Sequence, residues 1–131
     1  MTLQRTKLLS IQSVTGIATV GIFTAGTTST PAGVAGTTYI RSVIMHNTGL
    51  GTARTSLYVY PTGQNVSGVG ATANRILRID LSPSETTFFE TNYPIVLTTG
   101  DKLAVEVNIP DSGGAGIGSA VNFMINGDTD I

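Results

Sequence analysis

The chain has 131 residues, a length that favours a single domain with a core of its own. It contains no cysteine, which excludes disulfides, a thiolate nucleophile and cysteine-ligated metal sites. Seven basic and eight acidic residues give a formal net charge of −1 and form no basic cluster. We therefore expect no direct binding of nucleic acid.

The low total charge is the most informative property of the composition. Charged residues make up 11% of the chain, against roughly 25% in typical soluble domains. Much of the surface must therefore consist of Thr, Ser, Asn, Gly and apolar atoms. Two interpretations are open: a threonine-rich β surface that is soluble by itself, or a surface that largely faces other subunits.

The first third of the chain is the least charged part. No residue between Leu8 and Ile40 carries a charge. This outline is similar to that of a secretory signal, but polar residues interrupt the apolar run from Ser10 onward. We therefore expect neither a signal peptide nor a membrane span. The segments Leu8–Val14 and Ile17–Thr24 instead predict one or two strands.

These first strands allow two structural roles. We assign residues 1–30 to an N-terminal arm or to edge strands, and residues 31–131 to the main domain. Exposed apolar surface costs about 25 cal/mol per Å², so the segment should lie against protein. Leu8, Leu9 and Ile11 are therefore candidates for a subunit contact, and we expect at least part of the arm to cross into a neighbour.

The rest of the chain alternates apolar and polar residues with a period of two, as strands with one buried face do. The segment Leu103–Ile109 shows this most clearly, with Val105 predicted in the core and Glu106 in solvent. The other predicted strands, in chain order, are Tyr39–His46, Ser56–Tyr60, Leu77–Leu81, Phe88–Phe89, Ile95–Leu97 and Val121–Ile125.

The connections contain Gly and Pro, and no window keeps the apolar stripe of a helix. The long ones are Gly26–Thr37, Pro61–Asn74 and Pro110–Ser119. Their residues are small and apolar to neutral apart from Asp111, which suits packing against a neighbour. We predict an all-β fold: an antiparallel two-sheet sandwich, jelly-roll-like, with about eight strands and an extended N-terminal segment. An immunoglobulin-like sandwich is the alternative, weakened because the chain lacks tryptophan and a cysteine pair.

No group of residues indicates catalysis, and we expect the protein not to be an enzyme. His46 is the only histidine, and we interpret it as an ordinary residue near a strand end. A pair of carboxylates for glycoside hydrolysis would have to come from four residues that we assign to solvated faces. These are Glu85, Glu90, Asp101 and Glu106.

Two further motifs suggest ions or phosphate only superficially. Asp128-Thr129-Asp130 has the spacing of a calcium loop but lacks its following glycine and its distant glutamate. The glycine-rich run from Gly113 to Gly118 lacks the lysine and the following helix of a phosphate loop. We expect no metal and no cofactor. Tyr58 and Tyr60 share one strand face and would stack on sugars if that face is open.

Several segments resemble small structural proteins of tailed bacteriophages. Thr38–Gly49 is similar to their strand that ends in an Asn-Thr turn, and Ser56–Gly63 is similar to the strand that follows. Pro94–Leu97 with Gly100–Leu103 resembles a later strand. The resemblance covers residues 38 to 109, and the segment before it lies outside.

The resemblance implies a β-sandwich that decorates or cements the phage head. Such a protein would act in the virion, after assembly in the host cytoplasm, as a homo-oligomer, for which we expect a trimer. Its partners would be the major capsid protein or other virion proteins, with no membrane or nucleic acid. Two alternatives stay open: a tail or fibre component, and a carbohydrate-binding module that uses Tyr58 and Tyr60.

Overall fold

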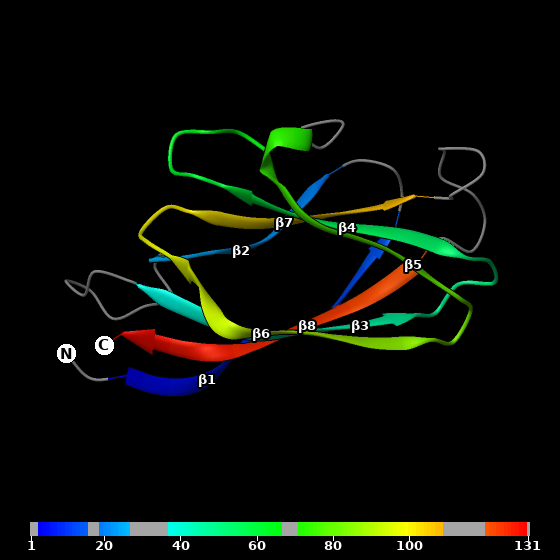
Figure 1. The fold of residues 1–131 in the computed structure, drawn as a ribbon, viewed down its shortest axis with the longest axis horizontal. Coiled ribbons are helices and arrows are strands. Elements are labelled where there is room, and N and C mark those ends of the chain that lie inside the picture. Colours follow the sequence, from blue (N-terminus) through cyan, green and yellow to red (C-terminus); the bar gives the residue numbers. More distant parts are fainter. Residues whose placement is uncertain (1–2, 16–18, 27–36, 67–70, 109–119, 131) are drawn as a thin grey trace.

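The computed structural model describes residues 3–15, 19–26, 37–66, 71–108 and 120–130, with residues 3–7, 15, 91 and 130 described by their backbone alone. This part of the chain forms eight strands in two layers and one short 3-10 turn at Thr72–Asn74 (Figure 1). The strands are β1 (Leu3–Thr15), β2 (Val20–Thr24), β3 (Thr38–Asn47), β4 (Ala53–Tyr60), β5 (Arg75–Leu81), β6 (Thr86–Leu97), β7 (Lys102–Asn108) and β8 (Ala120–Asp130).

The strand order identifies the architecture. One sheet has the order β1-β8-β3-β6 and the other β2-β7-β4-β5, and all neighbours are antiparallel. Four of these pairs are those of a long hairpin that folds back at the β4–β5 connection: β1·β8, β2·β7, β3·β6 and β4·β5. Rolling this hairpin so that β3 also meets β8 and β4 also meets β7 produces a jelly roll. The predicted all-β, jelly-roll-like sandwich is confirmed.

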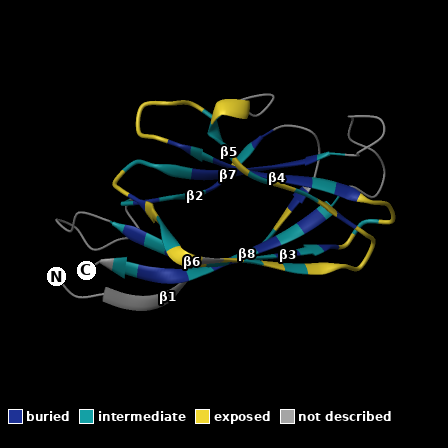
Figure 2. Cartoon of the chain, viewed as in Figure 1, coloured by how far each residue is buried: buried dark blue, intermediate teal, exposed yellow. Residues whose placement is uncertain are grey.

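The core lies between the two layers and takes alternate residues from each strand (Figure 2). On β8 these residues are Val121, Phe123 and Ile125, and on β7 they include Val105 and Val107, all fully buried. Each such side chain contributes about 1.5–3 kcal/mol when it leaves water. The prediction that Val105 faces the core is confirmed.

The N-terminal segment lies in the sandwich of its own chain. Strand β1 pairs with β8 from Leu3 opposite Asp130 to Thr15 opposite Ala120, and β2 pairs with β7. Both are edge strands. Edge strands were the second of the two roles, arm or edge strands, that we assigned to residues 1–30. The backbone N–H and C=O groups on one side of β8 find their partners in β1, and leaving such groups unpaired is costly. Residues 27–36 and 109–119, which include the glycine-rich run, lie outside the described chain.

Strand β6 corrects one sequence expectation. The two short strands predicted at Phe88–Phe89 and Ile95–Leu97 are parts of one strand. Pro94 interrupts the sequence pattern but not the strand, because β6 is an edge strand on which a missing N–H need not break a ladder bond. The pairing with β3 shifts between Ile40, opposite Ile95, and Ser42, opposite Glu90, so the extra residues form a bulge on β6 that includes Pro94.

A buried asparagine fastens one end of the sandwich. Asn47, the last residue of β3, donates from Nδ2 to the carbonyl oxygens of Gly51 and Leu81, both at 2.9 Å. Its Oδ1 accepts a hydrogen bond from the N–H of Gly49 at 2.8 Å. One side chain therefore holds the β3–β4 turn against the end of β5.

Gly127 allows β8 to approach its neighbours closely. A Cβ atom at this position would lie 2.1 Å from the carbonyl oxygen of Tyr39 and 2.9 Å from Cδ1 of Leu8. The carbonyl is backbone and cannot rotate away. Gly127 lies opposite Ile40, next to the register shift of β3, so the irregular pairing at this point requires a residue without a side chain.

We therefore expect Gly127→Ala to destabilise the fold by at least about 2–3 kcal/mol, because β8 must move away from β3. Gly51→Ala is the control, since a Cβ there meets nothing within 4 Å. Denaturant unfolding followed by circular dichroism measures both changes. Equal stability of the two variants would show that β8 does not approach β3 as described.

Candidate protein-binding face

The outer face of the β1-β8-β3-β6 sheet carries a row of four apolar side chains, one from each strand. Ile44 on β3 pairs with Met124 on β8 and with Phe88 on β6. Ile11 continues the row on β1, because it precedes Gln12, the partner of Phe123. We call these four residues the apolar row.

The ends of the apolar row are the most exposed. Ile11 is 70% and Phe88 is 60% exposed, while Ile44 and Met124 between them are half-buried. Scattered exposed apolar residues are ordinary on soluble proteins, whereas a contiguous group usually marks a surface that another molecule covers. The row is such a group, since it runs without interruption across four adjacent strands.

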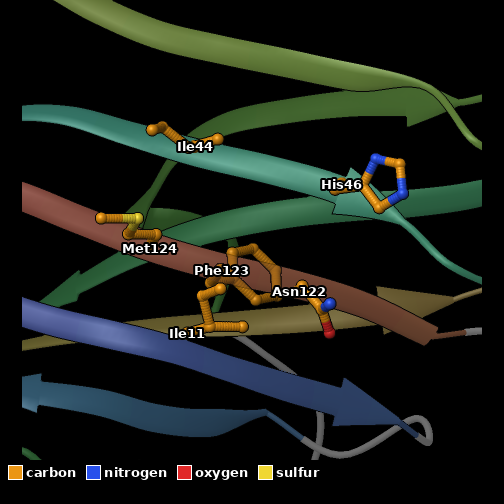
Figure 3. Close-up of a pocket in the computed structure, with 6 residues that line it drawn as sticks. All are labelled: Ile11, Ile44, His46, Asn122, Phe123 and Met124. Atoms are coloured by element: carbon orange, nitrogen blue, oxygen red, sulfur yellow. The ribbon is translucent and has the colours of Figure 1, made fainter.

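A hollow of about 240 Å³ lies along the row. Figure 3 shows that its lining residues come from three neighbouring strands, β1, β8 and β3. They are Ile11, Ile44, His46, Asn122, Phe123 and Met124. The hollow lies where the pairing of β1 with β8 is irregular, between Leu9 and Gln12, and such a bulge locally bends an edge strand.

Polar residues border the row on both sides. On one side Asn122 pairs with His46, whose Nδ1 lies 2.7 Å from the hydroxyl oxygen of Thr86. On the other side Ser42 lies between Asn126 on β8 and Glu90 on β6. The face thus has an apolar band between two polar bands, the usual layout of a protein-binding surface.

The sequence contains a signal for this row that the reading by alternation missed. The strands hold unbroken apolar runs at Val43–Met45, Phe88–Phe89 and Phe123–Ile125. Because neighbouring strand residues point to opposite faces, such runs give a strand two apolar faces. Only one of these faces can meet the core, so Ile44, Phe88 and Met124 remain outside it.

Of the three residues predicted for a subunit contact, only Ile11 is well exposed. Leu8 and Leu9 are half-buried and pack against the core. Consecutive strand residues do not normally share a face; here the register shift between Lys7 and Leu9 brings both toward the interior. A subunit contact through Ile11 stays a prediction.

The tyrosine pair does not form an open platform. Tyr58 and Tyr60 are 2% and 4% exposed, on the outer face of the other sheet. The segment that follows β4 covers them: Val66 packs against the cluster that both tyrosines form with Ala104, and the hydroxyl of Tyr60 accepts a hydrogen bond from the N–H of Ala71 at 3.1 Å. The open face on which sugar stacking depends is absent from this described region.

Glu106 corrects a second sequence expectation. Alternation placed it in solvent, but it is 6% exposed and accepts a hydrogen bond from the hydroxyl of Tyr58 at 2.9 Å. Burial, and then the hydrogen bond and charge of Glu106, raise the pKa of Tyr58. Glu106 does point to the outer face. On that face the segment after Pro61 packs Val66 against the cluster that includes Tyr58, and Lys102 donates from Nζ to the carbonyl of Gln64. Glu106 is therefore buried beside a tyrosine that is itself covered.

The other carboxylates hold turns and strands together. Glu85 accepts the N–H of Ser82 at 2.7 Å within the β5–β6 turn. Asp128 is buried beside Arg41, whose Nε lies 2.5 Å from its carboxylate. Glu90 is exposed on β6. In the part of the chain that is described, no three His, Asp or Glu side chains gather in a way that would hold a metal ion.

Asp101 connects two loops at one end of the sandwich. It accepts hydrogen bonds from the N–H and hydroxyl of Thr98, at 3.0 and 2.9 Å, and from the N–H of Thr62 at 2.9 Å. The bond from the Thr98 backbone, the largest influence, and those from Thr62 lower the pKa of Asp101. Its role is structural.

Comparison of the chain with protein-family models, curated proteins and solved structures finds no match. A bilayer-spanning helix does not occur among the described residues.

The contact between Glu106 and Tyr58 can be tested with matched substitutions. We expect Glu106→Thr to cost about 1–3 kcal/mol, because the buried hydroxyl of Tyr58 loses its acceptor. Glu90→Thr makes the same change on an exposed strand and should stay within about 0.5 kcal/mol of the parent. Tyr58→Phe added to Glu106→Thr should cost less than the two separate losses combined. Additive losses in urea unfolding would contradict the contact.

The lowered pKa of Asp101 predicts a pH dependence. A carboxylate with a lowered folded-state pKa stabilises the protein above its unfolded-state pKa of about 3.9, and this contribution disappears as the pH falls through the folded-state pKa. Asp101→Asn should therefore lower the free energy of unfolding by about 1 kcal/mol at pH 6, allowing for solvent screening, and by much less near pH 3. Glu90→Gln is the matched control. If Asp101→Asn lowered the stability equally at both pH values, the charge of the Asp101 carboxylate would not be what stabilises the fold here.

Proposed function

We propose that the protein is a structural component of a bacteriophage particle, most directly a head decoration or cement protein. It binds other protein subunits of the particle, further copies of this chain included, through the apolar row. The observation that carries this proposal is the row itself: four adjacent apolar side chains on the outer face of a sheet, in a chain with 11% charged residues. Its support from sequence is the resemblance of residues 38 to 109 to such proteins.

The energetics of the row suit an assembly protein. Full burial of a side chain such as Phe88 or Ile11 contributes about 1.5–3 kcal/mol. That is modest for one contact after the entropy of association is subtracted. A symmetric particle repeats the same contact at many equivalent positions, so a small protein can reinforce the particle without a large interface per copy.

The alternative functions differ in their support. A carbohydrate-binding module based on Tyr58 and Tyr60 loses its basis, because both rings are covered by their own chain. A tail or fibre component would use the same kind of row for assembly, and the experiment below separates it from a head protein.

The test uses heads and tails of the phage that encodes this chain, assembled without it. We expect the purified protein to co-sediment with heads at a fixed copy number, and Ile44→Asp to weaken this binding at least tenfold. Ile76→Asp is the matched control, since Ile76 is 44% exposed on β5 of the opposite sheet. Binding to tails alone would make the protein a tail component, and binding to neither would refute the proposal.

A further inference from the structure

We propose that the subunit that covers the apolar row is a second copy of this chain. The two copies pack face to face through the β1-β8-β3-β6 sheets, about a two-fold axis that runs parallel to the strands between β8 and β3. This inference rests on one premise of the proposed function, namely that the apolar row is an interface.

This axis places apolar residues of one copy opposite apolar residues of the other. Because β8 and β3 are the two central strands, the rotation places β8 of one copy over β3 of the other, and β1 over β6. Met124 then meets Ile44 of the partner copy, and Ile11 meets Phe88. Every member of the apolar row acquires an apolar neighbour, as the isologous contact of a two-fold dimer requires.

The polar borders match as well. Asn122 comes to lie opposite His46 of the second copy, and Asn126 opposite Ser42, since these residues are paired neighbours on β8 and β3 within one chain. Amide, imidazole and hydroxyl groups both donate and accept hydrogen bonds. The polar borders can therefore satisfy one another while the apolar row loses its contact with water.

Charge does not oppose this packing. Arg41 on β3 and Asp128 on β8 form an ion pair, in which the Arg41 side chain is 53% exposed and the Asp128 side chain 4% exposed. The same rotation brings Arg41 of each copy over β8 of the other, on the side of Asp128 and away from the second Arg41. Like charges are therefore not forced together.

Shape selects this axis over the alternative one. Phe88 protrudes from β6 at one end of the row, and the hollow extends from β3 over β8 to Ile11 on β1, the other end. The axis along the strands places Phe88 over β1 of the partner, at the hollow beside Ile11. An axis along the row would instead put Phe88 against Phe88 and one hollow against the other.

The face is large enough for a stable dimer. Its strands have 10 to 13 residues. At about 3.3 Å per residue and about 4.8 Å between strands, the face measures roughly 35 by 19 Å. The area of this rectangle is roughly 650 Å², without the additional surface of the side chains. It is close to the ~800 Å² that each partner buries in a standard interface. A face that complements itself about a two-fold axis closes with two copies, so we propose a dimer in place of the trimer expected from the sequence.

The opposite sheet does not compete for this role. Its outer face carries the ion pair of Arg54 with Asp80, at 2.8 Å, and is partly covered by the segment from Pro61 to Val66. In the dimer these two faces point away from each other, which leaves both available to other subunits of a particle.

The absence of cysteine makes the geometry directly testable. Ser13 on β1 pairs with Asn122, and Thr86 on β6 pairs with His46, so both border the same side of the row. The proposed axis places Ser13 of one copy over Thr86 of the other. Facing sheets lie about 10 Å apart, too far for a disulfide, so we use a short bis-maleimide reagent of matching reach.

We expect a mixture of the Ser13→Cys and Thr86→Cys variants to yield at least ten times more covalent dimer than either variant alone. The parent protein should sediment as a dimer. Ile44→Asp should sediment as a monomer with its circular dichroism spectrum preserved, while Ile76→Asp stays dimeric. A monomeric or trimeric parent, or equal cross-linking of the single variants, would overturn the inference. A monomer that still binds heads through Ile44 would refute the dimer and leave the proposed function standing.

Discussion

Strand β8 is the member of the fold on which both surfaces of its sheet depend. It pairs with β1 on one side and with β3 on the other along nearly its whole length. Its inward residues, Val121, Phe123 and Ile125, fill the core, and its outward residues carry the middle of the apolar row. Gly127 lets it lie against the irregular stretch of β3. If β8 shifted by one residue, inward and outward side chains would exchange, and the core and the binding face would be lost together.

The outer faces of the two sheets differ in whether the chain itself covers their large side chains. On the β2-β7-β4-β5 sheet, the chain covers its own tyrosines with the segment that follows β4, and Glu106 satisfies the hydroxyl of Tyr58 beneath it. On the other sheet no described segment covers Ile11 and Phe88. The molecule therefore covers the outer face of one sheet with its own chain and leaves the apolar row of the other exposed.

The fold was predictable because its information is local. Alternation in Leu103–Asn108 placed Val105 in the core, and turn residues bounded most strands. The apolar row was not, because its four residues come from strands separated by up to 113 positions, from Ile11 to Met124, and only the pairing brings them together. Glu106 was misplaced for a related reason: alternation indicates which face a residue occupies, but not whether a distant loop covers that face. The bulge that turns both Leu8 and Leu9 inward likewise leaves no periodic signal.

The pairing of β1 with β8 also has a consequence for biosynthesis. The ribosome makes Leu3 well over a hundred residues before its partner Asp130, so β1 waits unpaired while the intervening strands emerge. Contacts this distant in sequence form late in folding. The β1-β8-β3-β6 sheet, and with it the assembled apolar row, exists only after β8 has been translated. Nascent chains on one messenger RNA thus lack the surface through which we propose that finished chains associate, so translation would keep folding apart from that association.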